Sequence, residues 1–255
     1  MDLKPVILHY EEVGQGTPLV LIHGFPLDHT IWQPVVDRLK SEVRLIQVDL
    51  RGYGQSPVTD GVYSMRLLAE DIYALVESLQ LPPAVIVGHS MGGYVSLAYA
   101  QAYPAAVAGL ALLGSQAGAD PLERRQARLN TADDVARKGS RVVADGAAPK
   151  MAADPALTEP LRQLMRKANP KAVIGSLRGM ADRPDMTEWL GSFEKPVVCV
   201  HGLDDAMIPP ERSRMMVQLL VRAWLVELPG VGHMPMMEAP DAVAGALRQL
   251  IQMVR

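Results

Sequence analysis

Short apolar runs recur along the chain, and each is bounded by Gly, Pro or Asp. The runs occupy residues 19–22, 43–48, 84–87, 110–113, 197–200 and 224–228. Runs of this length with such borders are typical of buried strands, so all six are predicted to be core strands. Residues 5–13 favour β-structure and precede a turn cluster at 14–18, which predicts an antiparallel edge strand.

Helical patterns lie between these runs. The clearest pattern repeats apolar residues at three- and four-residue steps behind Ser64, a plausible helix cap: Met65, Leu68, Ile72, Leu75, Val76 and Leu79. Strands that alternate with helices predict an α/β fold with a mostly parallel central sheet. Residues 78–119 contain no Asp, Glu, Lys or Arg. Polar residues, Gly and Pro interrupt this segment too often for a membrane span, so it is predicted to form the buried centre of the sheet.

One region breaks the alternation. Residues 115–189 contain helix formers, many charges and no convincing buried strand, which predicts a helical cap inserted into a core made of 1–114 and 190–255. The cap contains 13 Lys+Arg and 10 Asp+Glu, whereas the whole chain has a net charge of −3. A basic cap would favour anionic substrates, but ordinary solvated helix faces explain the excess more simply, because salt screens small imbalances.

Length and composition narrow the class of protein. A chain of 255 residues fits one large domain with an insertion, and its slightly acidic balance argues against nucleic acid as a partner. The start of the chain lacks a basic segment followed by an apolar stretch, so we expect a cytoplasmic protein without a membrane partner. The single cysteine, Cys199, lies in an apolar run and is expected to be a buried packing residue. The oligomeric state is not predicted.

The sharpest chemical signal is the segment Gly88-His-Ser-Met-Gly-Gly93, which directly follows one predicted strand and precedes a helical pattern. A G-x-S-x-G turn in this context forces the serine into a strained conformation and exposes its hydroxyl group. We therefore predict that Ser90 is a nucleophile. The backbone N–H of Met91, at the start of the helix, would then point at an oxyanion.

A serine hydroxyl needs a histidine base and a carboxylate that orients the base. Of the six histidines, His233 is the best candidate, because it lies in a flexible, glycine-rich loop after the last predicted strand. Asp204 and Asp205 are adjacent in the loop after the penultimate strand, and either could reach His233. The resulting order along the chain, Ser, Asp, His, is that expected for the α/β-hydrolase fold.

These motifs resemble the α/β-hydrolase family, in particular the group of small bacterial carboxylesterases, enol-lactonases and cofactor-free haloperoxidases, over nearly the whole chain. In that family the triad aspartate follows the glycine of the strand-end motif by three residues and precedes a proline by four. The resemblance thus implies Asp205, with Asp204 shaping the loop. The segment His23-Gly24-Phe25-Pro26 is similar to the family's oxyanion loop, which implies that Phe25 supplies a second backbone N–H.

The resemblance also implies roles outside the triad. The loop 49–56 resembles a family loop beside the oxyanion segment, and we expect it to form hydrogen bonds and charge pairs beneath the site. The insertion corresponds to the family's cap, which shapes the acyl and alcohol pockets. Met207 and Met234 are near Asp205 and His233 in sequence, and their thioethers suit an apolar pocket, although ordinary core packing explains them equally well.

The predicted function is a serine hydrolase that cleaves a carboxylic ester or lactone through an acyl-enzyme. We expect no cofactor and no metal, because the chain has no Walker-type loop and no metal-ligand spacing. Acyl transfer to hydrogen peroxide and C–C bond hydrolysis use the same residues and stay open, as does a ligand receptor of this fold with little turnover. Dehalogenase and epoxide-hydrolase activities are disfavoured, because those enzymes use a carboxylate nucleophile where this chain has Ser90.

Overall fold

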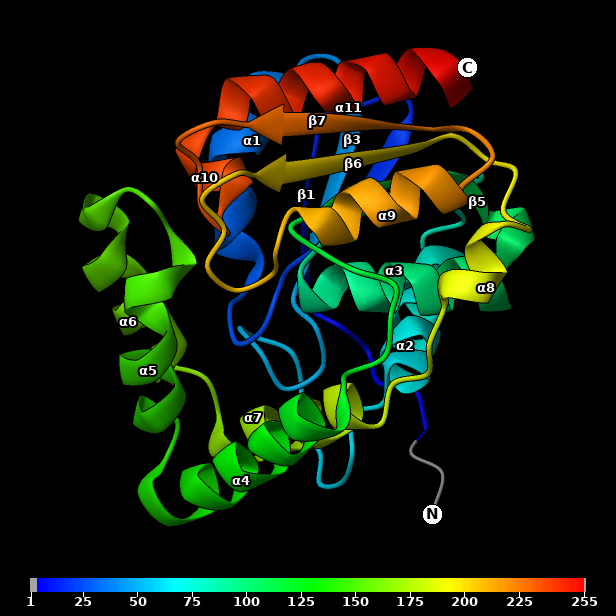
Figure 1. Cartoon of the computed structure of the whole chain (residues 1–255). Coiled ribbons are helices and arrows are strands. Elements are labelled where there is room, and N and C mark those ends of the chain that lie inside the picture. Colours follow the sequence, from blue (N-terminus) through cyan, green and yellow to red (C-terminus); the bar gives the residue numbers. More distant parts are fainter. Residues whose placement is uncertain (1–3, 255) are drawn as a thin grey trace.

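Seven strands form one sheet, and six of them run parallel. The computed structural model describes residues 4–254. The strands follow the order β1-β3-β2-β4-β5-β6-β7, with β1 antiparallel to β3 (Figure 1). Their bounds are β1 Tyr10–Val13, β2 Pro18–Ile22, β3 Arg44–Val48, β4 Ala84–His89, β5 Val107–Leu113, β6 Val197–Gly202 and β7 Ala223–Leu228. The predicted α/β class with a mostly parallel sheet is confirmed.

The charge-free segment forms the centre of the sheet, as predicted. Strands β4 and β5 pair in parallel, with Ile86 opposite Leu110, and both strands are almost entirely buried. Because all parallel strands point the same way, the loops after β2, β4, β5, β6 and β7 meet at one edge of the sheet. Ligands of open α/β sheets bind at this carboxyl edge.

Both edges of the sheet differ from the prediction. The expected strand over 5–13 is shorter and begins at Tyr10, because N–H groups before Tyr10 donate to side chains instead of a neighbouring strand. The N–H of Val6 donates to Asp71 Oδ1 (2.9 Å), and the N–H of His9 donates to Ser56 Oγ (2.8 Å). The segment 224–228 was predicted to be a core strand, but β7 has a single neighbour and is mostly half-buried.

Helices cover both faces of the sheet. Helices α1 (Gln33–Leu39) and α11 (Pro240–Val254) pack together over one face, and α2 (Met65–Ser78), α3 (Met91–Ala102) and α9 (Glu211–Leu219) lie on the other (Figure 1). The short α10 (Pro235–Glu238) follows the last strand. The predicted cap of α2 is present, since the Ser64 hydroxyl accepts a hydrogen bond from the N–H of Leu67 (3.1 Å).

Between β5 and β6 the chain is helical. This stretch contains α4 (Leu122–Lys138), α5 (Arg141–Met151), α6 (Thr158–Arg166), α7 (Pro170–Ala181) and the short α8 (Thr187–Leu190), and no strand. Helix α4 packs on α7 and α5 on α6, and these four helices stand apart from the layers that cover the sheet (Figure 1). We call α4–α7 the cap helices, although the division into a 115–189 cap and a core stays a prediction. Among the helices of residues 4–254, none is both long and apolar enough to cross a membrane.

Candidate active site

Ser90 occupies a strained turn between β4 and α3. Its backbone has φ 52° and ψ −115°, a conformation that residues other than glycine rarely adopt. Two hydrogen bonds hold the turn: the N–H of Ser90 donates to Leu113 O (2.9 Å), and the carbonyl of Ser90 accepts from Ser115 Oγ (2.9 Å). The last residue of strand β5 and the second residue after its end therefore fix the position of the serine.

The glycines around Ser90 are required by close contacts. A Cβ atom on Gly88 would lie 2.3 Å from Ser96 Oγ, and one on Gly92 would lie 2.3 Å from the carbonyl oxygen of Ile22. Neither distance is compatible with a side chain. The glycines of the motif therefore allow helix α3 to begin directly against β2 and β4.

His233 links Ser90 to a carboxylate. Its Nε2 lies 2.9 Å from Ser90 Oγ, and its Nδ1 lies 2.7 Å from Asp205 Oδ2. An ionised carboxylate only accepts hydrogen bonds, so Nδ1 carries the proton and Nε2 is left to accept the proton of the serine hydroxyl. The loop that carries His233 is tied to the cap, because the N–H of His233 donates to Met151 O (2.9 Å).

Asp205, and not Asp204, lies against His233. The Asp205 side chain is buried, and its Oδ1 accepts hydrogen bonds from the N–H groups of Met207 (2.8 Å) and Ile208 (2.9 Å). Burial alone would raise the pKa of Asp205, but the charge of His233 and the hydrogen bonds to the carboxylate together lower the pKa. Asp204 is exposed at the surface, as expected for a residue that shapes the loop.

A second histidine, His201, lies beside Asp205 and was not among the predicted site residues. Nε2 of His201 lies 3.2 Å from Asp205 Oδ2 and 2.9 Å from the carbonyl oxygen of Ile208. Its Nδ1 accepts a hydrogen bond from the Ser213 hydroxyl (2.6 Å). His201 is the penultimate residue of strand β6, four residues before Asp205, and this spacing near a strand end was the available signal.

His89, the neighbour of Ser90 in the chain, bonds to the loop that carries His233. It is fully buried, and its Nε2 donates to the carbonyl oxygen of His233 (2.8 Å). Its Nδ1 has no hydrogen-bond partner within residues 4–254. Burial lowers the pKa of His89 well below the ordinary value, so this imidazole is neutral at physiological pH.

The loop 23–26 lies directly beside Ser90. A Cβ atom on Gly24 would lie 2.5 Å from His89 Nδ1 and 3.1 Å from Ser90 Cβ, so glycine permits this approach. His23 holds the loop: its Nε2 accepts from the N–H of Leu50 (2.9 Å), and its Nδ1 donates to Gly24 O (2.9 Å). Phe25 lines the same cavity as Ser90.

Met91 is the first residue of α3, and the first N–H groups of a helix have no acceptor within the helix. The serine side chain and this N–H therefore start from neighbouring residues at the same helix end. An oxyanion hole formed by the N–H groups of Phe25 and Met91 stays a prediction.

The loop 49–56 forms buried hydrogen bonds and charge pairs. The Arg51 guanidinium and the Asp71 carboxylate form a fully buried ion pair (2.6 Å). Asp49 accepts from the N–H of His29 and of Gln55, each at 2.9 Å. These contacts agree with the expected supporting position of the loop.

The reactive pair, Ser90 and His233, faces a cavity of about 50 Å³ that opens to solvent. It is lined by Phe25, Ser90, Tyr94, Arg124, Arg128, Met151, Met180, Met207, Ile208 and His233. Met207 lines the cavity, but the prediction for Met234 is wrong: Met234 is fully buried and lies outside the lining. The cap helices supply methionines and two arginines instead, which the sequence did not single out for this site.

Other groups with reactive side chains are accounted for by packing. Cys199 is fully buried in β6, where burial raises the pKa of its thiol to about 12, so it is no nucleophile. Two clusters of potential metal ligands share His29, namely His9–Glu11–His29 and Asp28–His29–Asp49. His29 already pairs with Asp49 through its Nδ1 (2.7 Å), and neither cluster includes Ser90.

Known proteins share the fold over nearly the full length of the chain. Residues 19–246 match the model described as the alpha/beta hydrolase family. An esterase from Thermogutta terrifontis, solved with malate bound, is 36% identical, with 97% of this chain and 93% of that chain covered and a TM-score of 0.93. The enol-lactonase from Burkholderia xenovorans LB400 is 23% identical, with 96% of each chain covered and a TM-score of 0.89. The AB hydrolase superfamily protein YisY of Bacillus subtilis is 29% identical, with 96% of this chain and 95% of that protein covered.

Proposed function

The chain belongs to the alpha/beta hydrolase family, and on that premise we propose that it hydrolyses carboxylic esters or lactones through an acyl-enzyme on Ser90. One observation supports this proposal above all others. Hydrogen bonds run without a break from the Ser90 hydroxyl through His233 to the Asp205 carboxylate. This sequence of groups is what serine nucleophiles need at neutral pH.

In the proposed first half-reaction, Nε2 of His233 removes the proton from Ser90 Oγ while Oγ attacks the ester carbonyl. The Asp205 carboxylate stabilises the imidazolium that forms. The N–H groups of Phe25 and Met91 donate to the oxyanion, and each such donor contributes about 3–4 kcal/mol in comparable sites. The imidazolium then protonates the leaving alkoxide, which departs as the alcohol, and the acyl group stays on Ser90.

In the second half-reaction, neutral His233 removes a proton from a water molecule that attacks the acyl carbonyl. The tetrahedral intermediate collapses, His233 returns the proton to Ser90 Oγ, and the carboxylic acid leaves. A lactone follows the same steps, except that the alcohol and the acid stay in one product. The proposed chemistry takes every proton and electron pair from substrate, water and these side chains.

The cavity supports a small substrate. Its volume of about 50 Å³ is well below the range of about 300–1,000 Å³ that is typical of ligand sites. Phe25, Met151, Met180 and Met207 provide apolar contacts for an acyl chain or an alcohol group. We therefore expect short acyl groups to be preferred over long ones.

The test is hydrolysis of p-nitrophenyl acetate, butyrate and octanoate by the wild type and by Ser90→Ala, with both proteins checked by circular dichroism. We expect acetate and butyrate to be cleaved, octanoate to be cleaved more slowly, and the variant to lose turnover. Undiminished turnover by a folded Ser90→Ala variant would refute the mechanism. Phosphonylation of Ser90 by a fluorophosphonate, located by mass spectrometry of tryptic peptides, gives an independent readout.

Two alternatives use the same groups. A perhydrolase transfers the acyl group to hydrogen peroxide, so peracid formation measured beside hydrolysis separates it from an esterase. A receptor of this fold binds a small ligand with negligible turnover across an ester panel. The expected cytoplasmic location stays a prediction.

A further inference from the structure

Two arginines of the cap helices face the cavity that contains Ser90 and His233. Arg124 and Arg128 are one turn apart on α4, so both side chains extend from the same face of that helix. Both line the cavity, together with aromatic, methionine and isoleucine side chains. Within the described part of the chain, this lining includes no aspartate and no glutamate.

The positive charge beside the cavity exceeds the negative charge that pairs with it. The buried Asp120 carboxylate contacts Arg128 through Nε, Arg183 through Nη1 (2.8 Å) and Arg124 at 3.7 Å. The charge of Asp185 also acts on Arg183. Three guanidinium groups and two carboxylates give this cluster a net positive charge, and the ionised Asp205 lies outside the cluster, where it pairs with His233. Burial raises the pKa of Asp120, but the arginines lower the pKa by more, so Asp120 is ionised.

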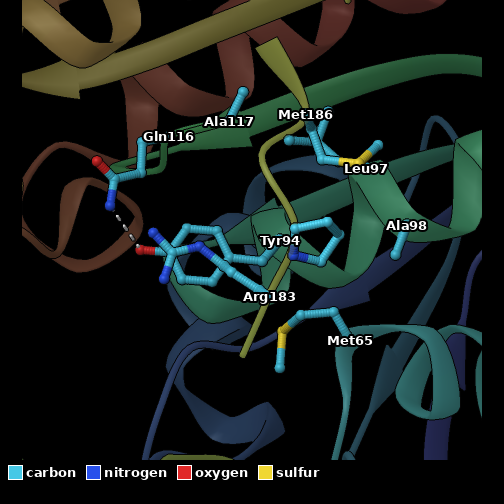
Figure 2. A pocket seen from close by; sticks show the side chains of 9 residues that line it. Met65, Tyr94, Leu97, Ala98, Gln116, Ala117, Arg183 and Met186 are labelled. Atoms are coloured by element: carbon cyan, nitrogen blue, oxygen red, sulfur yellow. Dashed lines mark hydrogen bonds between the residues drawn. The ribbon is translucent and has the colours of Figure 1, made fainter. Parts of the chain in front are cut away.

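Arg183 anchors this cluster and takes no part in the lining of the reactive cavity. Its guanidinium stacks on the Tyr94 ring at 4.3 Å from the ring centre, and Figure 2 shows the two side chains overlapping beside an apolar pocket. It donates to the carbonyl oxygens of Gly118 (2.8 Å) and Met180 (3.1 Å). Arg183 thus holds Asp120 through an ion pair, and Asp120 in turn positions Arg128.

The outer nitrogen atoms of Arg124 and Arg128 have few strong acceptors. Arg128 uses Nε for Asp120, and its Nη1 lies 3.4 Å from the thioether sulfur of Met180, which is a weak acceptor. Arg124 donates from Nη2 to Met207 O at 3.2 Å. Carboxylates are the preferred partners of guanidinium groups in this geometry, because two parallel N–H groups match two oxygens.

We infer that Arg124 and Arg128 form an anion subsite, and that the natural substrates are small esters or lactones that carry a carboxylate group. This inference rests on the proposed function, because the subsite lies in the same cavity as Ser90. The arginines bind the carboxylate while Ser90 attacks the ester carbonyl. In a cavity with apolar walls, this pair of contacts orients the substrate and favours anionic over neutral esters.

The test compares two substrates that differ by one group. Monomethyl adipate has a free carboxylate where methyl hexanoate has a methyl group, and both have the same methyl ester. We expect the wild type to have a kcat/KM for monomethyl adipate at least about tenfold above that for methyl hexanoate, as one charge-assisted pair provides. Butyryloxyacetate and ethyl butyrate form a second pair, in which the carboxylate of the anionic ester is on the alcohol side.

Variants assign the preference to the arginines. Arg128→Gln and Arg124→Gln are each expected to lower the ratio of the two kcat/KM values by about tenfold to a hundredfold, mainly through KM for the anionic ester. Arg128→Lys keeps the positive charge but loses the two parallel N–H donors of the guanidinium group, so it should retain part of the preference for the anionic ester. Arg125→Gln is the matched control: Arg125 lies on the same helix, is exposed and pairs with Asp182 (2.6 Å), so its loss should leave the ratio unchanged.

The outcomes separate the subsite from the proposed function. A wild type that cleaves both esters equally well, with a ratio that no arginine variant alters, overturns the subsite and leaves the esterase intact. A wild type that cleaves neither of these esters nor the p-nitrophenyl esters overturns the proposed function. If the variants fold poorly, inhibition of wild-type p-nitrophenyl acetate hydrolysis decides: adipate should inhibit far better than the neutral adipamide, and equal inhibition refutes the subsite.

Discussion

Nε2 of His201 lies 3.2 Å from the same carboxylate oxygen of Asp205 that faces His233. Asp205 is therefore held from two sides by imidazole rings, and from a third by two backbone N–H groups. A carboxylate with so many donors has one well-defined orientation. In the proposed mechanism, that orientation sets the tautomer and the position of His233.

His201 is thus predicted to be a positioning residue. His201→Phe keeps a ring of similar volume but removes the contact with Asp205, so we expect kcat for p-nitrophenyl acetate to fall about tenfold, in line with the loss of a hydrogen bond to a charged group. KM should change by less than about twofold, because the ring does not line the cavity. His9→Asn, at the partly exposed N-terminal segment, should change neither value. Equal losses in both variants would contradict the positioning role.

The two adjacent aspartates should differ sharply. Asp205→Asn removes the charge beside His233 and lets the amide favour the wrong tautomer, so kcat should fall by roughly three to four orders of magnitude. Asp204→Asn alters an exposed side chain and should leave kcat within about twofold. Steady-state kinetics on p-nitrophenyl butyrate measures both. A severe loss in Asp204→Asn together with a mild loss in Asp205→Asn would reverse the assignment.

Gly92 is predicted to tolerate no side chain. A Cβ atom there would lie 2.3 Å from Ile22 O, so Gly92→Ala must displace strand β2 or helix α3, at a cost of about 1–3 kcal/mol or more in the free energy of unfolding. Gly245→Ala, in α11, meets nothing within 4 Å and should raise the free energy of unfolding by about 0.5–1 kcal/mol. Urea denaturation measures both variants, and an unchanged midpoint for Gly92→Ala would refute the close packing.

The buried His89 should make stability depend on pH. Its pKa is well below 6.5 in the folded protein, whereas an exposed imidazole in the unfolded chain titrates near that value. Between these two pKa values the unfolded chain binds more protons, so the free energy of unfolding falls as pH drops below about 6.5. The slope from one histidine reaches at most about 1.4 kcal/mol per pH unit.

His89→Gln removes this titration and keeps a donor for the carbonyl of His233. Denaturation of both proteins at pH 7.5 and 5.5 should show a smaller loss of stability in the variant. His23, whose pKa is also lowered by burial, remains in both proteins and cancels from the comparison. Equal losses in the two proteins would show that His89 is protonated without cost in the fold.

The local structure of this protein was predictable from the sequence alone. The Gly88–Gly93 turn, the Ser64 cap and the central strands depend on residues that are close in the chain, where side-chain period and steric fit decide conformation. The sequence by itself also placed Ser90 and His233 as partners, because the order of loops along a parallel sheet is limited. It left Asp204 and Asp205 open until the family resemblance pointed to Asp205.

Tertiary packing decided what no local pattern contains. It shortened the first strand, since side chains of Asp71 and Ser56 took up its N–H groups, and it left β7 half-buried at an edge. It placed Met234 in the core rather than in the cavity, and it brought His201 against Asp205.

The arginines of α4 illustrate the physical reason. Their sequence pattern is that of an exposed, charged helix, and only the packing of α4 on α7 and against the loop after β6 turns Arg124 and Arg128 toward Ser90. Contacts between distant segments depend on how whole helices pack, and the period of a single helix does not encode which neighbour it will meet.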